Sequence, residues 1–119
     1  MDSRVANMAI SRPASASVLA EETLSTLVTR VMKSVSKAFD SISPGLAAVA
    51  LWNIMVTQRL GYADVVGMPA QFIEGLRAIY DEAQAKAIEA KIVKEVQAEF
   101  GLAEKAMSFP DAVRSVLTR

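Results

Sequence analysis

The stretch Leu46-Ala-Ala-Val-Ala-Leu-Trp-Asn-Ile-Met-Val56, which continues to Leu60, decides the fold. It carries no charge before Arg59, and the helix that it predicts is apolar on nearly every side. A helix of that kind is covered either by other helices or by lipid. At about 15 residues it reaches about 22 Å, which is less than the ~30 Å hydrocarbon core of a bilayer. We therefore predict a central core helix over residues 46–60.

The composition favours long helices with few connections. The chain has 119 residues, which fits one domain, and 52% of them are hydrophobic, with only 5 glycines and 4 prolines. We predict an all-α fold, a bundle of three main helices and a short C-terminal helix, over residues 17–42, 46–60, 69–100 and 109–118.

The first predicted helix follows a short arm. Residues 1–14 show no hydrophobic period, so we expect a flexible N-terminal arm, followed by a single helical domain over 15–119. Apolar residues then recur at steps of three and four up to Ile42. Ser43-Pro44-Gly45 ends this helix, because proline disfavours a helical conformation at the residue before it and glycine permits a reversal.

The later helix boundaries are also marked by residue type. Residues 61–68 form a connection with room for one helical turn, and Pro69 suits the first position of the next helix. Its apolar pattern continues to Phe100, with a small rotation of the stripe part-way, and Gly101 is a good C-cap. Ser108 and Asp111 are spaced as in a capping box, which predicts the start of the last helix.

The predicted helices are too long for a compact monomer. Helices over 17–42 and 69–100 span about 39 and 48 Å, whereas a compact chain of this length has a radius of gyration of about 13–14 Å. Their apolar residues run to the ends, so we predict a homo-oligomer or an element exchanged between subunits. Trp52 is interpreted as a core anchor or, if exposed, as an interface hot spot. The predicted core and interface residues are Leu27, Val31, Phe39, Trp52, Met55, Phe72, Leu76, Tyr80, Ile92, Val96 and Phe100.

The sequence lacks two residue types that are common in catalytic and metal sites. The chain has no cysteine and no histidine, and 13 basic residues balance 13 acidic ones. Glu95 and Glu99 could share one helix face, but a di-metal bundle also needs histidine ligands, so a solvated charged face is the better interpretation. We predict no catalytic, cofactor or metal site and no enzyme activity. The N-terminus is not a signal peptide, so we expect an intracellular protein, or a virion component if the chain is viral.

Residues 62–77 resemble the helix-turn-helix of bacterial and phage repressors in the spacing of Ala63, Gly67, Met68, Ile73 and Leu76. The same small and apolar positions are buried in any tight helical corner, which is the alternative interpretation. The resemblance implies that one face of the second helix meets DNA, with Gln71 as a base reader and Arg77 as a backbone contact. The residues placed on that face are Ala70, Gln71, Glu74 and Gly75.

A second resemblance covers residues 47–82. An Ala/Val-rich helix, Gly61-Tyr62, and Pro69-x-x-Phe72-Ile73-x-x-Leu76-x-x-x-Tyr80-Asp81-Glu82 are similar to the all-helical nucleocapsid shell proteins of enveloped double-stranded RNA phages, the cystoviruses. The resemblance implies a virion coat of many copies, built by helix exchange and lying between a polymerase core and a membrane.

Three functions remain in competition. The leading hypothesis is a non-enzymatic structural or assembly protein that acts through helix-mediated self-association. A virion shell component is one form of this hypothesis. Its principal partner is a second copy, with other assembly proteins as further partners. The alternative is a DNA-binding regulator using residues 62–77, although the balanced charge disfavours nucleic acid. The third is a peripheral membrane protein whose first helix meets the membrane surface through Arg30, Lys33 and Lys37.

Overall fold

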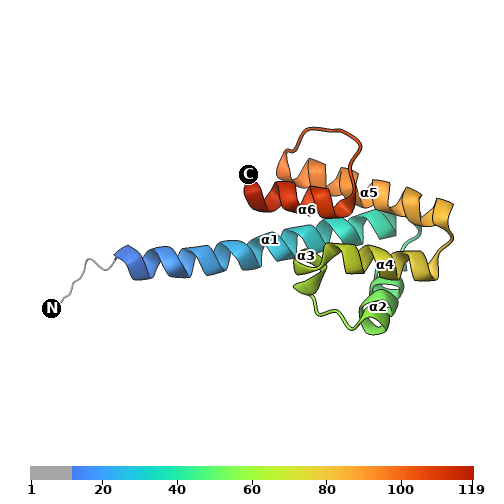
Figure 1. The fold of residues 1–119 in the computed structure, drawn as a ribbon, viewed down its shortest axis with the longest axis horizontal. Coiled ribbons are helices and arrows are strands. Elements are labelled where there is room, and N and C mark those ends of the chain that lie inside the picture. Colours follow the sequence, from blue (N-terminus) through green and yellow to red (C-terminus); the bar gives the residue numbers. More distant parts are fainter. Residues whose placement is uncertain (1–11) are drawn as a thin grey trace.

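The computed structural model describes residues 12–119, with side chains described from Leu24 onward. Within this part of the chain all regular structure is helical, which confirms the predicted all-α class (Figure 1). The helices are α1 (Arg12–Ile42), α2 (Leu46–Gln58), α3 (Asp64–Gly67), α4 (Pro69–Ile79), α5 (Glu82–Phe100) and α6 (Phe109–Thr118).

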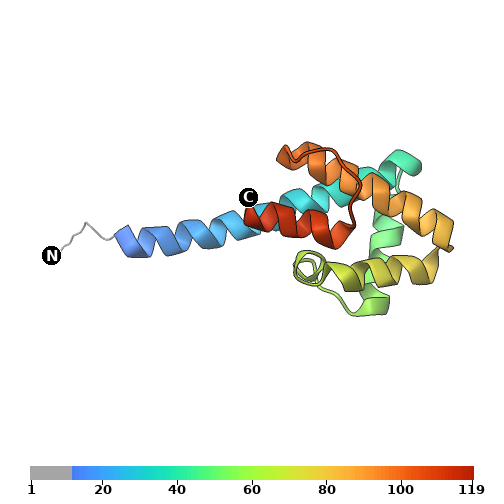
Figure 2. The same cartoon turned by 45° about the horizontal axis from the view of Figure 1, so that its top comes forward.

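The C-terminal half of α1 is the centre of the bundle. Helix α5 packs on one side of it and α2 on another, while α4 packs against α2 and α6 packs against α4 and α5 (Figures 1 and 2). Val31, Val35 and Phe39 of α1 are completely buried. Their spacing of four residues places them in one row along the helix. The buried Met32 and Ala38 widen this row into a stripe that more than one neighbouring helix can cover. The helix predicted to be central, 46–60, is therefore not the central one.

The N-terminal half of α1 extends beyond the other helices, as both views of the ribbon show (Figures 1 and 2). The Cα radius of gyration is 17.7 Å, above the ~13.5 Å expected of a compact chain of this length. A protruding helix was predicted from helix length, and α1 confirms it. Helix α1 begins at Arg12, so residues 12–14 of the predicted arm are helical, and residues 1–11 lie outside the described part.

The boundary signals of the sequence are confirmed at four places. Gly45 has a φ of 84°, which a glycine adopts without strain, and α2 begins at the next residue. Pro69 is the first residue of α4. Gly101 caps α5 with a φ of 65°. Ser108 caps α6, because its Oγ accepts a hydrogen bond from the Asp111 N–H at 3.2 Å.

The predicted continuous helix over 69–100 is wrong at one point, because Tyr80 and Asp81 separate α4 from α5. Tyr80 is extended, with φ −111° and ψ 155°. Asp81 acts as an N-cap, its Oδ1 accepting a hydrogen bond from the Gln84 N–H at 2.8 Å. The carboxylate satisfies a donor that a new helix start leaves unpaired, which stabilises the interruption. The rotation of the apolar stripe in the sequence is therefore a change of helix.

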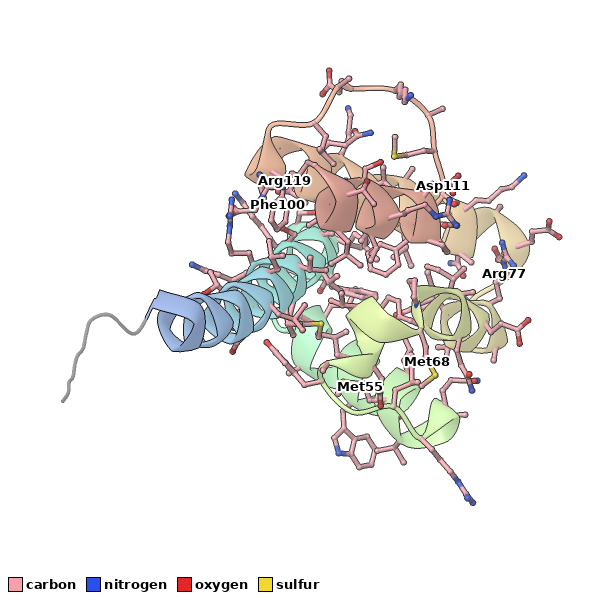
Figure 3. The ribbon with its side chains drawn as sticks, turned by 60° about the vertical axis from the view of Figure 1, so that its left-hand side comes forward. Met55, Met68, Arg77, Phe100, Asp111 and Arg119 are labelled. Atoms are coloured by element: carbon pink, nitrogen blue, oxygen red, sulfur yellow. The ribbon has the colours of Figure 1, made fainter. Side chains whose placement is uncertain are left out.

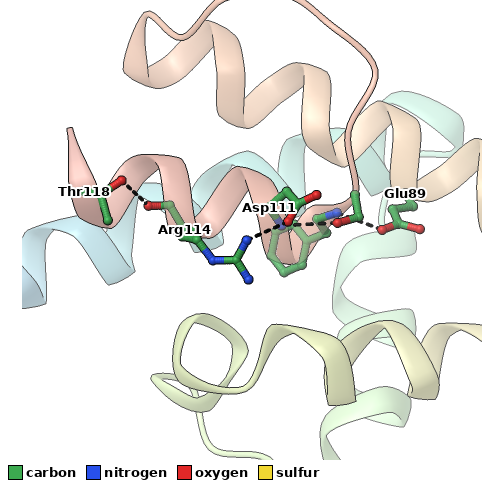
Figure 4. Close-up of polar contacts among 6 residues, drawn as sticks. Glu89, Asp111, Arg114 and Thr118 are labelled. Atoms are coloured by element: carbon green, nitrogen blue, oxygen red, sulfur yellow. Dashed lines mark hydrogen bonds and ion pairs between the residues drawn. The ribbon is translucent and has the colours of Figure 1, made fainter.

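The loop after α5 brings α6 back onto the bundle. Phe109 is completely buried, and its ring centroid lies 5.6 Å from that of Phe72 on α4. The Phe109 N–H donates to Glu89 Oε2 on α5 at 2.8 Å, next to the Ser108 cap (Figure 4). An aromatic pair and a charge-assisted hydrogen bond thus fix the start of α6 to two other helices.

Phe100 is held between two arginines at the end of α5. The guanidinium carbon of Arg30 lies 4.2 Å from the ring centroid and that of Arg119 lies 4.9 Å from it (Figure 3). Arg30 Nε also donates to Glu99 Oε2 at 2.6 Å, which connects α1 to α5. This hydrogen bond lowers the pKa of Glu99 below its usual value.

The lowered pKa of Glu99 predicts how its contribution to stability changes with pH. A carboxylate whose pKa is lower in the folded state stabilises the fold fully above its unfolded pKa and loses that contribution as the pH falls through the folded value. We expect Glu99→Gln to be less stable than wild type at pH 7 and the difference to shrink as the pH falls below about 4. Urea unfolding at a series of pH values measures it. Glu104→Gln, in the loop after α5, is the control, and a difference for Glu99→Gln that stays constant down to pH 2 contradicts the assignment.

Helices α2 and α4 approach each other most closely at Gly75. A Cβ atom at this position would lie 2.8 Å from Ile54 Cγ2 and 2.7 Å from Gln58 Cγ. Ile54 is completely buried and stiff at its branched Cβ, so it cannot easily give way. The crossing of these two helices therefore requires a residue without a side chain.

We expect Gly75→Ala to lower the free energy of unfolding by about 1–3 kcal/mol through overpacking, although alanine is the better helix former by about 1 kcal/mol. Denaturant titration followed by circular dichroism measures the change. Gly67→Ala is the matched control, since a Cβ there meets nothing within 4 Å. A Gly75→Ala protein as stable as wild type would show that the two helices are not in contact here.

Candidate interaction surface

Helix α2 is covered on one face only. Its buried residues are Ala47, Ala50 and Ile54, which lie one helical turn apart and face α1 and α4. The two alanines are small, so the helix can sit close to its neighbours. The prediction of a fully wrapped core helix over 46–60 is therefore wrong, because two neighbouring helices cover the narrow alanine face and leave the opposite face uncovered.

The uncovered face is apolar. Val49 is 61% exposed, Trp52 66% and Val56 56%. Their spacing of three and four residues places them in one row along the helix, which we call the α2 outer face. Helix α2 itself contains no charged residue. Single exposed apolar residues are common on monomers, whereas a row of three on one helix is a candidate interaction surface.

The structure decides between the two interpretations of Trp52. The core-anchor interpretation is wrong, because two thirds of the side chain is exposed, and the interface interpretation remains. Among the other predicted core and interface residues, Leu27, Met55 and Tyr80 are half-buried. Those that are buried are Val31, Phe39, Phe72, Leu76, Ile92, Val96 and Phe100.

Further apolar side chains are exposed where α2 leads into α3 and α4. Tyr62 and Met68 are exposed on either side of α3, and the half-buried Met55 is labelled with Met68 at this end of the molecule (Figure 3). Sequence reasoning missed Val49 and Val56 as surface residues. The alanines at 47 and 50 were the available signal, because small residues on one face of an apolar helix mark the side of close helix contact.

The residues of the helix-turn-helix interpretation are only partly placed as it requires. Gln71 and Arg77 are exposed on α4. Gly75 is not on the free face, since it lies against Ile54 and Gln58 of α2, so its predicted orientation toward DNA is wrong. The first helix of the motif is a single turn, α3.

Two acidic side chains of α5 pair with basic side chains of α1. Glu99 pairs with Arg30, and Glu95 Oε1 lies 3.8 Å from Lys37 Nζ. In the part of the chain with described side chains, acidic residues do not gather in groups of three or more that could hold a metal ion. Among the described helices, none has the length and apolar character needed to cross a membrane.

Comparisons with protein-family models, curated proteins and solved structures give no match to this chain. The candidate site therefore rests on the geometry of the α2 outer face.

Proposed function

We propose that this protein is a non-enzymatic structural or assembly protein that associates with further copies of itself through the α2 outer face. The observation that carries the proposal is the exposure of Trp52 between Val49 and Val56 on an uncharged helix. Tryptophan is among the residues that dominate binding energy at protein interfaces.

The charge of the chain supports a second copy as the partner. A net charge far from zero keeps proteins apart, but 13 basic and 13 acidic residues cancel here. Two copies therefore meet without long-range repulsion, and the α2 outer face itself contains no charge that would have to be desolvated.

The protruding half of α1 supports the same proposal. Leu24 is exposed where α1 leaves the bundle. Most of the stability of a helix in a protein comes from packing of its apolar face, so a neighbouring copy that packs against this protruding segment would stabilise it. With contacts at α2 and at α1, one subunit reaches more than one neighbour. The proposal therefore extends to a shell of many copies, as the resemblance of residues 47–82 to cystovirus shell proteins implies.

The expected behaviour is association that rises with protein concentration and depends on Trp52. We expect Trp52→Ala to weaken self-association by about 2 kcal/mol or more, which is about 30-fold in the dissociation constant. Size-exclusion chromatography with light scattering on the full chain measures it.

Leu117→Ala is the matched control, because Leu117 is also exposed but lies on α6. It is expected to associate as wild type does. A wild-type chain that stays monomeric at high micromolar concentration rules the proposal out, and so does an equal effect of the two variants.

A further inference from the structure

A pocket lies on the other side of the bundle from α2. The loop over residues 102–108 arches away from α5 and returns to α6 (Figure 1). Between this loop and α5 is a cavity of about 350 Å³. Its walls include Ala90 and Val93 of α5 and Ala106 and Met107 of the loop.

Gln97 gives this pocket its one buried polar side chain, while the exposed Lys94, Glu104 and Lys105 also line it. Its side chain is buried, with only 3% of the residue exposed, and it lines the cavity. Its Nε2 donates to the Lys105 carbonyl oxygen at 2.9 Å, which holds the loop to α5. Its Oε1 accepts no hydrogen bond from the residues whose side chains the structure describes. The pocket therefore combines apolar residues and three exposed charged ones with one buried acceptor that receives no hydrogen bond from the described side chains.

Resting on the proposed function, we infer that Trp52 of one copy inserts into this pocket of the next copy. An indole has an apolar body and one polar group, the Nε1–H, which donates and cannot accept. That is the complement of apolar walls around Gln97 Oε1. The size also fits, since a cavity of ~150 Å³ holds a benzene ring and this one is about 350 Å³.

Trp52 is the best-placed side chain for this role. Tyr62 also carries a donor, but it lies in the connection between α2 and α3 and not in a row of apolar residues on a helix. Trp52 stands on a regular helix between Val49 and Val56, which are exposed and give it apolar neighbours on the same helix face. We expect Tyr62→Phe, which keeps the ring and removes the hydroxyl, to assemble as wild type.

The positions of the two surfaces determine the kind of assembly. Helices α2 and α5 pack on different sides of α1, and the loop over residues 102–108 and α2 lie at opposite edges of the molecule in two views (Figures 1 and 3). One copy therefore cannot fill its own pocket. A contact between two different surfaces is head-to-tail, and its repetition gives a ring or an open array with one Trp52 and one pocket used per subunit.

Mixing two variants tests this inference. Trp52→Ala removes the inserting side chain and keeps the pocket, whereas Ala106→Phe keeps Trp52 and fills the pocket from an exposed loop position. Each variant alone is expected to stay monomeric, and an equimolar mixture is expected to form a dimer of one copy of each. Trp52 is the chain's only tryptophan, so in the mixture its fluorescence comes from the Ala106→Phe copy alone. Its emission should shift to shorter wavelength as the Trp52→Ala copy is added.

Two further variants keep the result decisive. Ala103→Phe places the same side chain in the same loop outside the pocket and should assemble as wild type. Ala90→Phe fills the pocket from α5 and replaces Ala106→Phe if that variant does not fold by circular dichroism. If both pocket-filling variants assemble as wild type, or if the mixture stays monomeric, this inference is overturned while self-association stands. If wild type itself is monomeric, the proposed function fails first.

Discussion

The burial of the C-terminal half of α1 is the contact on which the rest of the bundle depends. Val31, Val35 and Phe39 have no exposed surface, and each fully buried side chain of this kind contributes about 1.5–3 kcal/mol. Helices α5 and α2 pack on different sides of α1, and α4 and α6 then close the structure over them. The other helices pack around α1 because its apolar stripe is wide enough to contact more than one neighbour.

The same arrangement explains why α2 has an exposed apolar face. Two neighbouring helices, α1 and α4, contact α2, and they meet its Ala47, Ala50 and Ile54 side. Helices α5 and α6 lie beyond α1 and α4, where they cannot reach the opposite side. The six helices therefore complete one core and leave a second apolar surface uncovered, with Trp52 at its middle. This surplus of apolar surface over available cover is the physical basis of the proposed assembly role.

Helix ends could be predicted from the sequence, but the orientation of α2 could not. Gly45, Gly101 and Ser108 act within one helical turn, so their effect is visible in a short stretch of residues. The break at Asp81 was missed because the apolar period carries on across it, although an aspartate three residues before Gln84 is a recognisable cap. Helix α2 has apolar residues on every face, so its hydrophobic period does not say which face lies outside. The small residues Ala47 and Ala50 were the local signal, and the positions of the neighbouring helices decide the orientation.

The close fit at Gly75 has a consequence for binding. With Ile54 seated against the backbone of α4, α2 has little freedom to roll or tilt. Its exposed row of side chains is thus preorganised, and little conformational entropy is lost when a partner settles on it. In the proposed assembly, a rigid face of this kind would also set the angle at which successive molecules join. Errors in that angle would accumulate along an array, so the missing methyl group of one glycine would contribute to the curvature of the proposed assembly.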